Sequence, residues 1–442
     1  MRRIGAGLLG VAMLASGCAY YNAIYNAEQA FDEGERLRRA GRDSAAVALY
    51  QDVIRHAADG YRQDPEGEWA DEALFLVGRA RLRLGESRAA RAALIRAAEA
   101  AQTEEARQSI LVYLAIAQAD AGDMVSALRV VNESLGGLRG GPALADGHLL
   151  RGRILLANDN DAGWWDLDRA PEVEVGTRVE AAIERLRWAF ANDQVDRAEE
   201  GFSRLLGYPE AGERVDTIVS LALAAADRWD AQVAADLLDR VSLTSWDQLA
   251  RARIVLTRAD LYLEAGNQEL ADRTARSVAD GVGDGAAEAR LRIAQWQLDE
   301  AARVQDLDGI EPLLLPVAGR PAAAAVLAAL DEVRALAGLG LDEPLAWFAA
   351  AETARDELGA WMLARGFFVA YADANHDAPW VPKALLAAID MSPGEGDRVW
   401  LRGRLEAFRD SPYVLAATGA AAPGFEALEE DLALRLSEVK RR

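Results

Sequence analysis

The feature that most constrains this chain is a short pattern that recurs along it: a helical stretch, a glycine with a polar residue beside it, and another helical stretch of similar length. Gly41, Gly85, Gly122 and Gly266 mark four of these stops. From residue 20 onward Ala, Leu, Arg and Glu dominate, and apolar residues recur at intervals of three and four, as on one face of a helix. The pattern predicts an all-α chain of antiparallel helical hairpins.

The hairpins recur with a long period. Units that begin near residues 27, 71, 108, 145, 179, 215 and 252 are 34 to 44 residues apart. Small residues recur at the eighth and twentieth positions of most units, and a larger apolar residue often stands at the twenty-fourth. Examples are Gly34, Ala46 and Tyr50; Gly78, Ala90 and Leu94; Ala115, Ala127 and Val131; Leu186, Ala198 and Phe202; Ala222, Ala234 and Leu238; and Ala259, Ala271 and Ala275. This arrangement resembles the tetratricopeptide repeat (TPR).

The resemblance implies a right-handed superhelical solenoid of TPR-like hairpins, in which small residues let paired helices approach closely. It is best over residues 22–280, and weaker helical pairs continue beyond. We therefore expect N-terminal TPR units over 19–142, central units over 143–280, C-terminal TPR-like hairpins over 281–391 and a helical cap over 392–442.

The first eighteen residues predict export and lipidation. A basic start is followed by Ile4 to Leu14, a mostly apolar run of about eleven residues, too short to span a bilayer. Leu14-Ala15-Ser16-Gly17-Cys18 resembles the lipobox of bacterial lipoproteins, whose cysteine is diacylated and becomes the first mature residue. We expect a signal peptide over 1–18 and a lipid-anchored protein on the periplasmic face of the outer membrane, because Ala19 is not the aspartate that often retains lipoproteins at the inner membrane.

Charge excludes one large class of partners. The sequence has 49 Lys and Arg against 71 Asp and Glu, a net charge of −22, which repels a phosphate backbone and makes nucleic acid an improbable partner. Only Lys383 and Lys440 are lysines, which we attribute to codon usage in a high-GC genome. With Cys18 as the only cysteine, the mature chain must be stabilised by packing and not by internal disulfides.

Two C-terminal segments repeat a junction seen near the N-terminus. The segment from His56 to Gly78, with a tyrosine, a proline-containing loop and an aromatic residue before the next helix, is echoed by 370–385 and more briefly by 408–413. Such junctions, and the start of the mature chain at residues 18–27, look like those of periplasmic TPR lipoproteins similar to BamD of the β-barrel assembly machine. That protein is much shorter, with about five repeats.

Residues suited to catalysis or metal binding are few. His56, His148 and His376 are far apart in sequence, and no metal-ligand spacing accompanies them, so we expect ordinary helix or loop histidines. The glycine-rich stretch 281–285 has no strand before it and no lysine after it, which indicates a linker. The stretch 158–163 resembles a calcium loop only faintly, since Arg169 occupies the position of the bidentate glutamate. The sequence predicts no enzyme, cofactor or metal.

Binding has better support. In a TPR superhelix the first helix of each hairpin lines the concave face, chiefly through its second, fifth, ninth, twelfth and thirteenth positions. These positions carry arginines beside apolar residues, which suit a carboxylate such as a peptide C-terminus next to an apolar side chain. The candidates are Phe75, Arg79, Arg83, Arg153 and Arg187. Alternatively, nearby acids such as Glu72, Asp146 and Glu180 simply pair with these arginines.

Trp164 and Trp165 follow the Asn/Asp-rich loop of the irregular fourth unit. Paired tryptophans in a loop suit a protein interface, or they fill the irregular unit. The functional expectation is a noncatalytic scaffold for protein partners of the cell envelope, with outer-membrane protein assembly as the expected process. The alternative is a periplasmic adaptor for peptidoglycan, cell-division or secretion machinery, and an envelope hydrolase ranks third.

Overall fold

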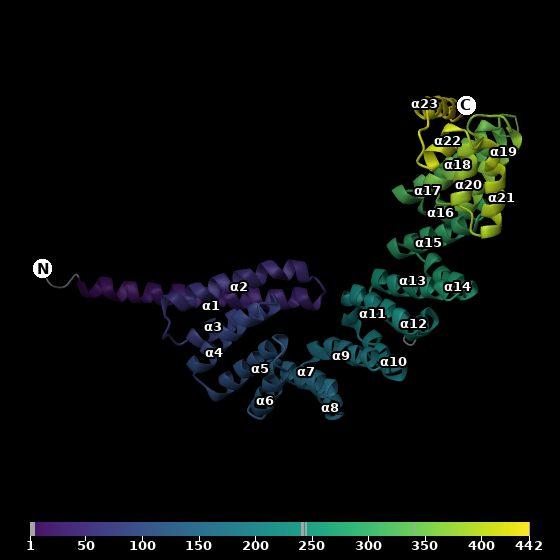
Figure 1. Cartoon of the computed structure of the whole chain (residues 1–442). Coiled ribbons are helices and arrows are strands. Elements are labelled where there is room, and N and C mark those ends of the chain that lie inside the picture. Colours follow the sequence, from purple (N-terminus) through teal and green to yellow (C-terminus); the bar gives the residue numbers. More distant parts are fainter. Residues whose placement is uncertain (1–4, 240–242, 244, 341, 442) are drawn as a thin grey trace. The chain divides into compact units, whose positions relative to one another are not determined.

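The computed structural model describes residues 5–239, 243, 245–340 and 342–441; for residues 5–21 it describes the helix but not the side chains. The chain divides into two compact units, residues 1–271 (unit 1) and 272–442 (unit 2) (Figure 1). Every regular element among the described residues is a helix, which confirms the all-α prediction. In the same residues no helix is both long and apolar enough to cross a membrane.

Unit 1 is a succession of helical pairs. Its helices are α1 (Gly5–Arg39), α2 (Asp43–Gln63), α3 (Ala70–Arg83), α4 (Ser87–Ala100), α5 (Glu104–Asp120), α6 (Met124–Leu135), α7 (Pro142–Ala157), α8 (Ala162–Val173), α9 (Arg178–Ala191), α10 (Val195–Leu206), α11 (Val215–Arg228), α12 (Ala231–Leu238) and α13 (Gln248–Glu264). A 3₁₀ segment, η2 (Pro209–Arg214), precedes α11, and α14 (Gln268–Ala279) contains the division between the units.

Unit 2 contains α15 (Asp284–Glu300), α16 (Ile310–Leu314), α17 (Pro321–Leu339), α18 (Leu345–Asp356), α19 (Trp361–Ala374), α20 (Val381–Asp390), α21 (Glu395–Leu405), α22 (Pro412–Ala417) and α23 (Phe425–Val439). In both units most helices pack against the next helix along the chain. The core of unit 2 includes an edge-to-face cluster in which the Phe348 ring lies 5.0 Å from Phe368 and 5.2 Å from Tyr371.

The predicted glycine stops are real helix ends of one kind. Gly41, Gly85, Gly122 and Gly266 have φ between +69° and +89°, a left-handed conformation that is strained for other residues. After each glycine, the next backbone N–H donates to a carbonyl five residues back, at 2.8–2.9 Å, which satisfies a helix-end carbonyl. The polar residue beside each glycine therefore belongs to a Schellman turn, which reverses the chain into the next helix.

The TPR register predicted from the sequence is confirmed by burial. Ala46, Ala90, Ala127, Ala198, Ala234 and Ala271, the small residues of the twentieth position, are at most 1% exposed. At the eighth position, a β-carbon added to Gly34 would lie 2.8 Å from the Tyr50 ring, and one added to Gly78 would lie 2.6 Å from Leu94. The eighth and twenty-fourth residues therefore touch across these two hairpins, which is TPR-like superhelical packing.

Two units keep this close approach with different residues. In the fourth, a β-carbon on Gly163 would lie 2.6 Å from the Gly152 carbonyl oxygen, so two glycines bring α7 and α8 together. In the fifth, the large Leu186 stands at the eighth position, and Gly201 on α10 leaves room for it, because a β-carbon there would lie 2.7 Å from Leu186. Helix contact is preserved because the small residue has moved to the partner helix.

We expect Gly78→Ala to lower the free energy of unfolding by about 1–3 kcal/mol, because the new methyl overlaps the buried Leu94 side chain. The control is Gly403→Ala in α21, where an added β-carbon meets nothing within 4 Å and alanine improves helix propensity by up to about 1 kcal/mol. Urea denaturation followed by far-ultraviolet circular dichroism measures both. Equal stability of the two variants would contradict the packing argument.

Candidate functional site

The first helices of the hairpins in unit 1, namely α1, α3, α5, α7 and α9, share a face that carries three adjoining cavities of about 370, 150 and 420 Å³. Asp146, Leu149 and Glu180 line both the first and the second cavity. Arg153 and Glu184 line both the second and the third. We call this continuous surface the inner groove.

Arg79 and Phe75 belong to an aromatic cluster at the 370 Å³ cavity. The Arg79 guanidinium lies 3.9 Å from the centre of the Phe31 ring, 5.0 Å from Tyr113 and 5.4 Å from Phe75. The Phe75 ring meets the edge of Tyr113 at 5.3 Å, and the Tyr113 hydroxyl donates to Asp146 Oδ2 at 2.7 Å. The Nε of Arg79 is buried without a hydrogen-bond partner among the described residues. Stacking on aromatic rings therefore holds this cation in place.

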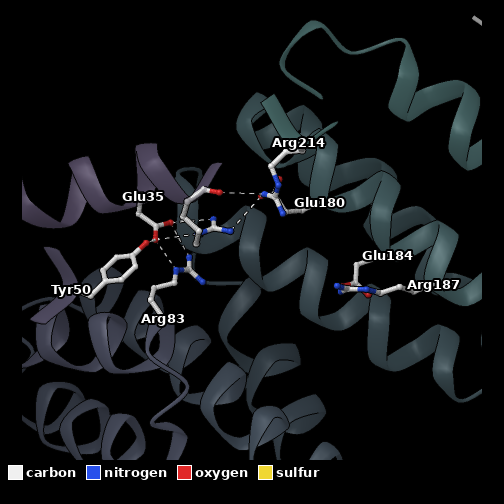
Figure 2. Close-up of polar contacts among 8 residues, drawn as sticks. Glu35, Tyr50, Arg83, Glu180, Glu184, Arg187 and Arg214 are labelled. Atoms are coloured by element: carbon white, nitrogen blue, oxygen red, sulfur yellow. Dashed lines mark hydrogen bonds and ion pairs between the residues drawn. The ribbon is translucent and has the colours of Figure 1, made fainter. Parts of the chain in front are cut away.

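Arg83 is fully engaged within the protein. Its Nε and Nη2 donate to the two carboxylate oxygens of Glu35 at 2.7 and 3.0 Å, a bidentate pair between α3 and α1 (Figure 2). The Tyr50 hydroxyl donates to the same carboxylate at 2.8 Å. Burial by itself would raise the pKa of Glu35, but Arg83, Arg38 and the Tyr50 hydroxyl outweigh it and hold that pKa far below its usual range. The same pairing raises the pKa of Arg83.

The last turn of α1 also contacts the fifth and sixth hairpins. Arg38 Nη1 lies 3.5 Å from Glu180 Oε1 on α9, and Arg214 Nη1 lies 3.9 Å from the same oxygen (Figure 2). Arg214 further donates to the backbone carbonyl of Arg38 at 3.4 Å. These contacts between segments far apart in sequence border the inner groove beside the 150 Å³ cavity.

Arg153 and Arg187 come together at the 420 Å³ cavity, whose other lining residues include Leu156, Leu167 and Trp188. Arg187 forms an ion pair with Glu184 at 2.7 Å, yet its side chain is 63% exposed. The carboxylate paired with Arg153 is Asp120, at 3.9 Å, and the Arg153 side chain is 39% exposed. Arg153 is thus only loosely paired with a carboxylate, at the edge of an apolar pocket.

The two tryptophans have different environments, and both lie inside α8, after the Asn/Asp-rich loop and not in it. Trp164 meets the edge of Trp188 at 5.0 Å and lies against the guanidinium groups of Arg185 and Arg197, at 5.1 and 5.0 Å. It therefore packs α8 against α9 and α10. Trp165 is 58% exposed.

His148 is more deeply placed than the sequence indicated. It is 6% exposed, and its Nδ1 lies 2.6 Å from Asp166 Oδ1. Arg151 donates two hydrogen bonds to the same carboxylate, at 2.6 and 2.8 Å. Burial opposes ionisation of Asp166, but the hydrogen bonds from His148 and Arg151 lower its pKa. This cluster joins α7 to α8.

Several residues of the inner groove were not selected from the sequence, although two of them stand at repeat positions that were used for the selection. Phe31 is the fifth and Glu35 the ninth residue of the first unit, the positions at which Phe75 and Arg79 were selected in the second. Tyr113 and Trp188 stand at positions not used in that selection. Cys18, the residue predicted to be lipidated, is among residues 5–21, whose side chains lie outside the described part of the chain.

No protein-family model matches the chain, and no curated protein matches it. Among solved structures, it is similar to a tetratricopeptide repeat protein from Parabacteroides merdae ATCC 43184, with 16% identity and a TM-score of 0.31 over 57% of this chain and 92% of that one. It is also similar to a monomeric mutant of IFIT1 with Gppp-AAAA, with 12% identity and a TM-score of 0.30 over 79% of this chain and 76% of that one. The TPR-like assignment rests on the hairpins and burial of this chain itself.

Within the described residues, no group of three or more His, Cys, Asp or Glu side chains is arranged to hold a metal ion. The inner groove provides surface for binding. It combines aromatic and aliphatic side chains with arginines that differ in how closely they are paired within the protein.

We expect Glu35→Gln to lower the free energy of unfolding by about 3 kcal/mol at neutral pH, because Arg83 is left without a partner. A depressed folded pKa stabilises the protein above the unfolded pKa, near 4.5, and this stabilisation is lost as the pH falls below that value. The wild type should therefore lose stability on acidification more steeply than the variant. Urea titrations at several pH values measure this, with the exposed Glu33→Gln as control; parallel pH profiles of wild type and Glu35→Gln would contradict the assignment.

Proposed function

We propose that this protein is a noncatalytic scaffold of the bacterial cell envelope, anchored by lipidated Cys18 to the periplasmic face of the outer membrane. Its inner groove binds partner proteins, and its nearest functional counterpart is a BamD-like component that organises the assembly of outer-membrane proteins. The observation that carries the proposal is the inner groove itself, a continuous surface lined by the first helices of five successive hairpins.

The chemistry of the groove supports a peptide segment as its ligand. The 420 Å³ cavity is lined by aliphatic residues and Trp188, which suit an apolar side chain, and Arg153 and Arg187 stand at the same cavity. Arginine binds carboxylates through paired donors, so a segment with a carboxylate next to an apolar side chain fits this pair. Arg79 and Arg83 have a structural role instead, because aromatic rings hold Arg79 and Glu35 pairs with Arg83.

The proposed location of the protein is supported by its sequence alone. The basic start, the short apolar run and the small residues before Cys18 suit a lipoprotein signal. Two acyl chains give the two-signal anchoring that holds a protein on a membrane without a spanning helix. The resemblance of the mature start and of the tyrosine-loop-aromatic junctions to envelope TPR lipoproteins favours the outer membrane.

Lipidation is directly measurable. Cells that express the protein with a palmitate analogue should incorporate label into it, and Cys18→Ala should abolish the label, because the cysteine sulfur carries the diacylglyceryl group. Mass spectrometry of the wild type should find a mature chain that begins at Cys18. A labelled Cys18→Ala protein, or a mature wild-type chain that starts elsewhere, would contradict the lipoprotein assignment.

The partner is tested by affinity purification of tagged protein from crosslinked envelopes in mild detergent. We expect an outer-membrane β-barrel with its assembly subunits, and we expect Arg153→Glu to lower their recovery at least about tenfold, since a charge-assisted hydrogen bond contributes about 1.5–3 kcal/mol. The matched control is Arg129→Glu on α6, an exposed arginine paired with Glu133 outside the groove.

Equal loss of partners from the Arg153→Glu and Arg129→Glu proteins would contradict binding in the groove. Recovery of peptidoglycan, cell-division or secretion proteins without a β-barrel would contradict the assembly role and favour the adaptor.

A further inference from the structure

The C-terminal helix α23 packs on unit 2 through one narrow stripe. Leu432, Leu436 and Val439 are 1–6% exposed and recur at intervals of four and three, on one face of the helix. They join the core of unit 2, where α23 contacts α18 (Figure 1). Other positions of α23 are open to solvent, including Leu434 at 58%.

Polar contacts fix the register of α23. Lys383 on α20 donates to both carboxylate oxygens of Glu429 at 2.8 Å. Trp380, at the start of α20, donates from its indole N–H to the Leu428 carbonyl at 3.2 Å. After the helix, Lys440 Nζ lies 2.8 Å from Glu332 Oε1 on α17 and donates to the Thr353 hydroxyl of α18 at 2.8 Å. The two lysines of the sequence, which we had attributed to codon usage, therefore both hold α23.

The covered face corresponds to the inner groove of unit 1. Trp69 caps α3, and Trp380 caps α20 at the repeated junction found in the sequence. By this junction α20 corresponds to α3, the first helix of its hairpin. In the same correspondence α18, which packs against α19 and contacts α23, stands for the first helix of the hairpin before it. In unit 1 this face carries open cavities, whereas in unit 2 a helix of the same chain lies on it.

The segment that connects α22 to α23 suits a helix that can detach from the rest of unit 2. Residues 418–421 and 423–424 are exposed, and Gly419 and Gly424 have φ of +73° and +84°. Three buried residues, the partly buried Phe425 and Leu428, and a few polar contacts hold this helix, which belongs to the less stable end of a structure, where local opening is frequent.

We propose that the face formed by α18 and α20 is a second binding groove, specific for an acidic amphipathic helix of a partner protein, and that α23 occupies it in the partner's absence. The recognised pattern is that of α23: a glutamate followed by apolar residues three, seven and ten positions later, as in Glu429, Leu432, Leu436 and Val439. Charge complementarity supports the choice, because Lys383 meets the glutamate and α23 carries five acidic residues against one arginine between 425 and 439.

This second groove differs from the inner groove of unit 1 in its residues and its ligand. An experiment that disproves it therefore leaves the proposed function unaffected. Helix-in-groove recognition reads a helix through such a stripe of apolar positions. A partner helix binds only after α23 departs, so its apparent affinity is reduced by the fraction of chains in which the groove is open.

The test uses the full-length protein and a fluorescent synthetic peptide with the sequence of residues 425–441, titrated by anisotropy. In Glu429→Ala, the intramolecular helix loses its contact with Lys383 while the groove is unchanged. We expect this variant to bind the peptide at least tenfold more tightly than the wild type. The control is Glu430→Ala, the exposed neighbour, with wild-type affinity. Adding Lys383→Ala to Glu429→Ala should abolish the gain, because the peptide's glutamate then has no partner.

Equal peptide affinity of Glu429→Ala and Glu430→Ala would overturn the proposal. A concentration-dependent dimer of Glu429→Ala that excludes the peptide would also overturn it, since the occupant would be a second copy of the chain. If Glu429→Ala does not fold, a protease site inserted between residues 419 and 423 of otherwise wild-type protein replaces it. After cleavage the peptide should displace α23, and retention of α23 against excess peptide would refute an exchangeable helix.

Discussion

The structure depends on one steric constraint, the close approach of the two helices of each hairpin. Where the eighth residue of a unit is glycine, its missing β-carbon is replaced by the side chain of the twenty-fourth residue, as with Gly78 and Leu94. Helices this close bury alanine faces that would contribute little at ordinary spacing, which explains how an alanine-rich chain obtains a continuous core. The exchange of sizes between Leu186 and Gly201 indicates that the spacing is what is kept, and the residue that provides it varies.

Close packing within hairpins leaves specificity to polar and aromatic groups on the shared face of the first helices. Buried apolar contacts do not distinguish one neighbouring hairpin from another, whereas the bidentate pair of Glu35 and Arg83 requires a single stagger between α1 and α3. Truncating one member of such a pair leaves a buried charge, so the pair penalises wrong stacking more than it adds net stability. The same face therefore carries two kinds of arginine. Firmly paired arginines such as Arg83 fix how the hairpins stack, whereas Arg153 is loosely paired.

The architecture was predictable because its determinants are local. The helix stops use a turn that needs glycine, and the period is visible in the small residues. The site was predictable only as a set of positions. That Arg83 pairs with Glu35, and not with Asp146, depends on the stagger between neighbouring hairpins, 48 residues apart in sequence. The Asn/Asp-rich stretch before the tryptophans left open whether they form an interface in a loop or fill the irregular fourth unit. In the structure α8 begins at Ala162, and Trp164 fills the space between α8, α9 and α10.

The two units cover the exposed face of their first helices in different ways. A face made of first helices retains unsatisfied apolar and charged groups wherever no neighbouring hairpin covers it. In unit 1 the aromatic rings around Arg79 and the ion pairs of Glu35 and Glu180 satisfy part of that face, and the remainder is the inner groove. In unit 2 a helix brings its own apolar stripe and its own glutamate to Lys383. A surface that accepts a helix by four side chains has the requirements of a receptor, because the contacts depend on the pattern that the helix presents and not on its being joined to the chain.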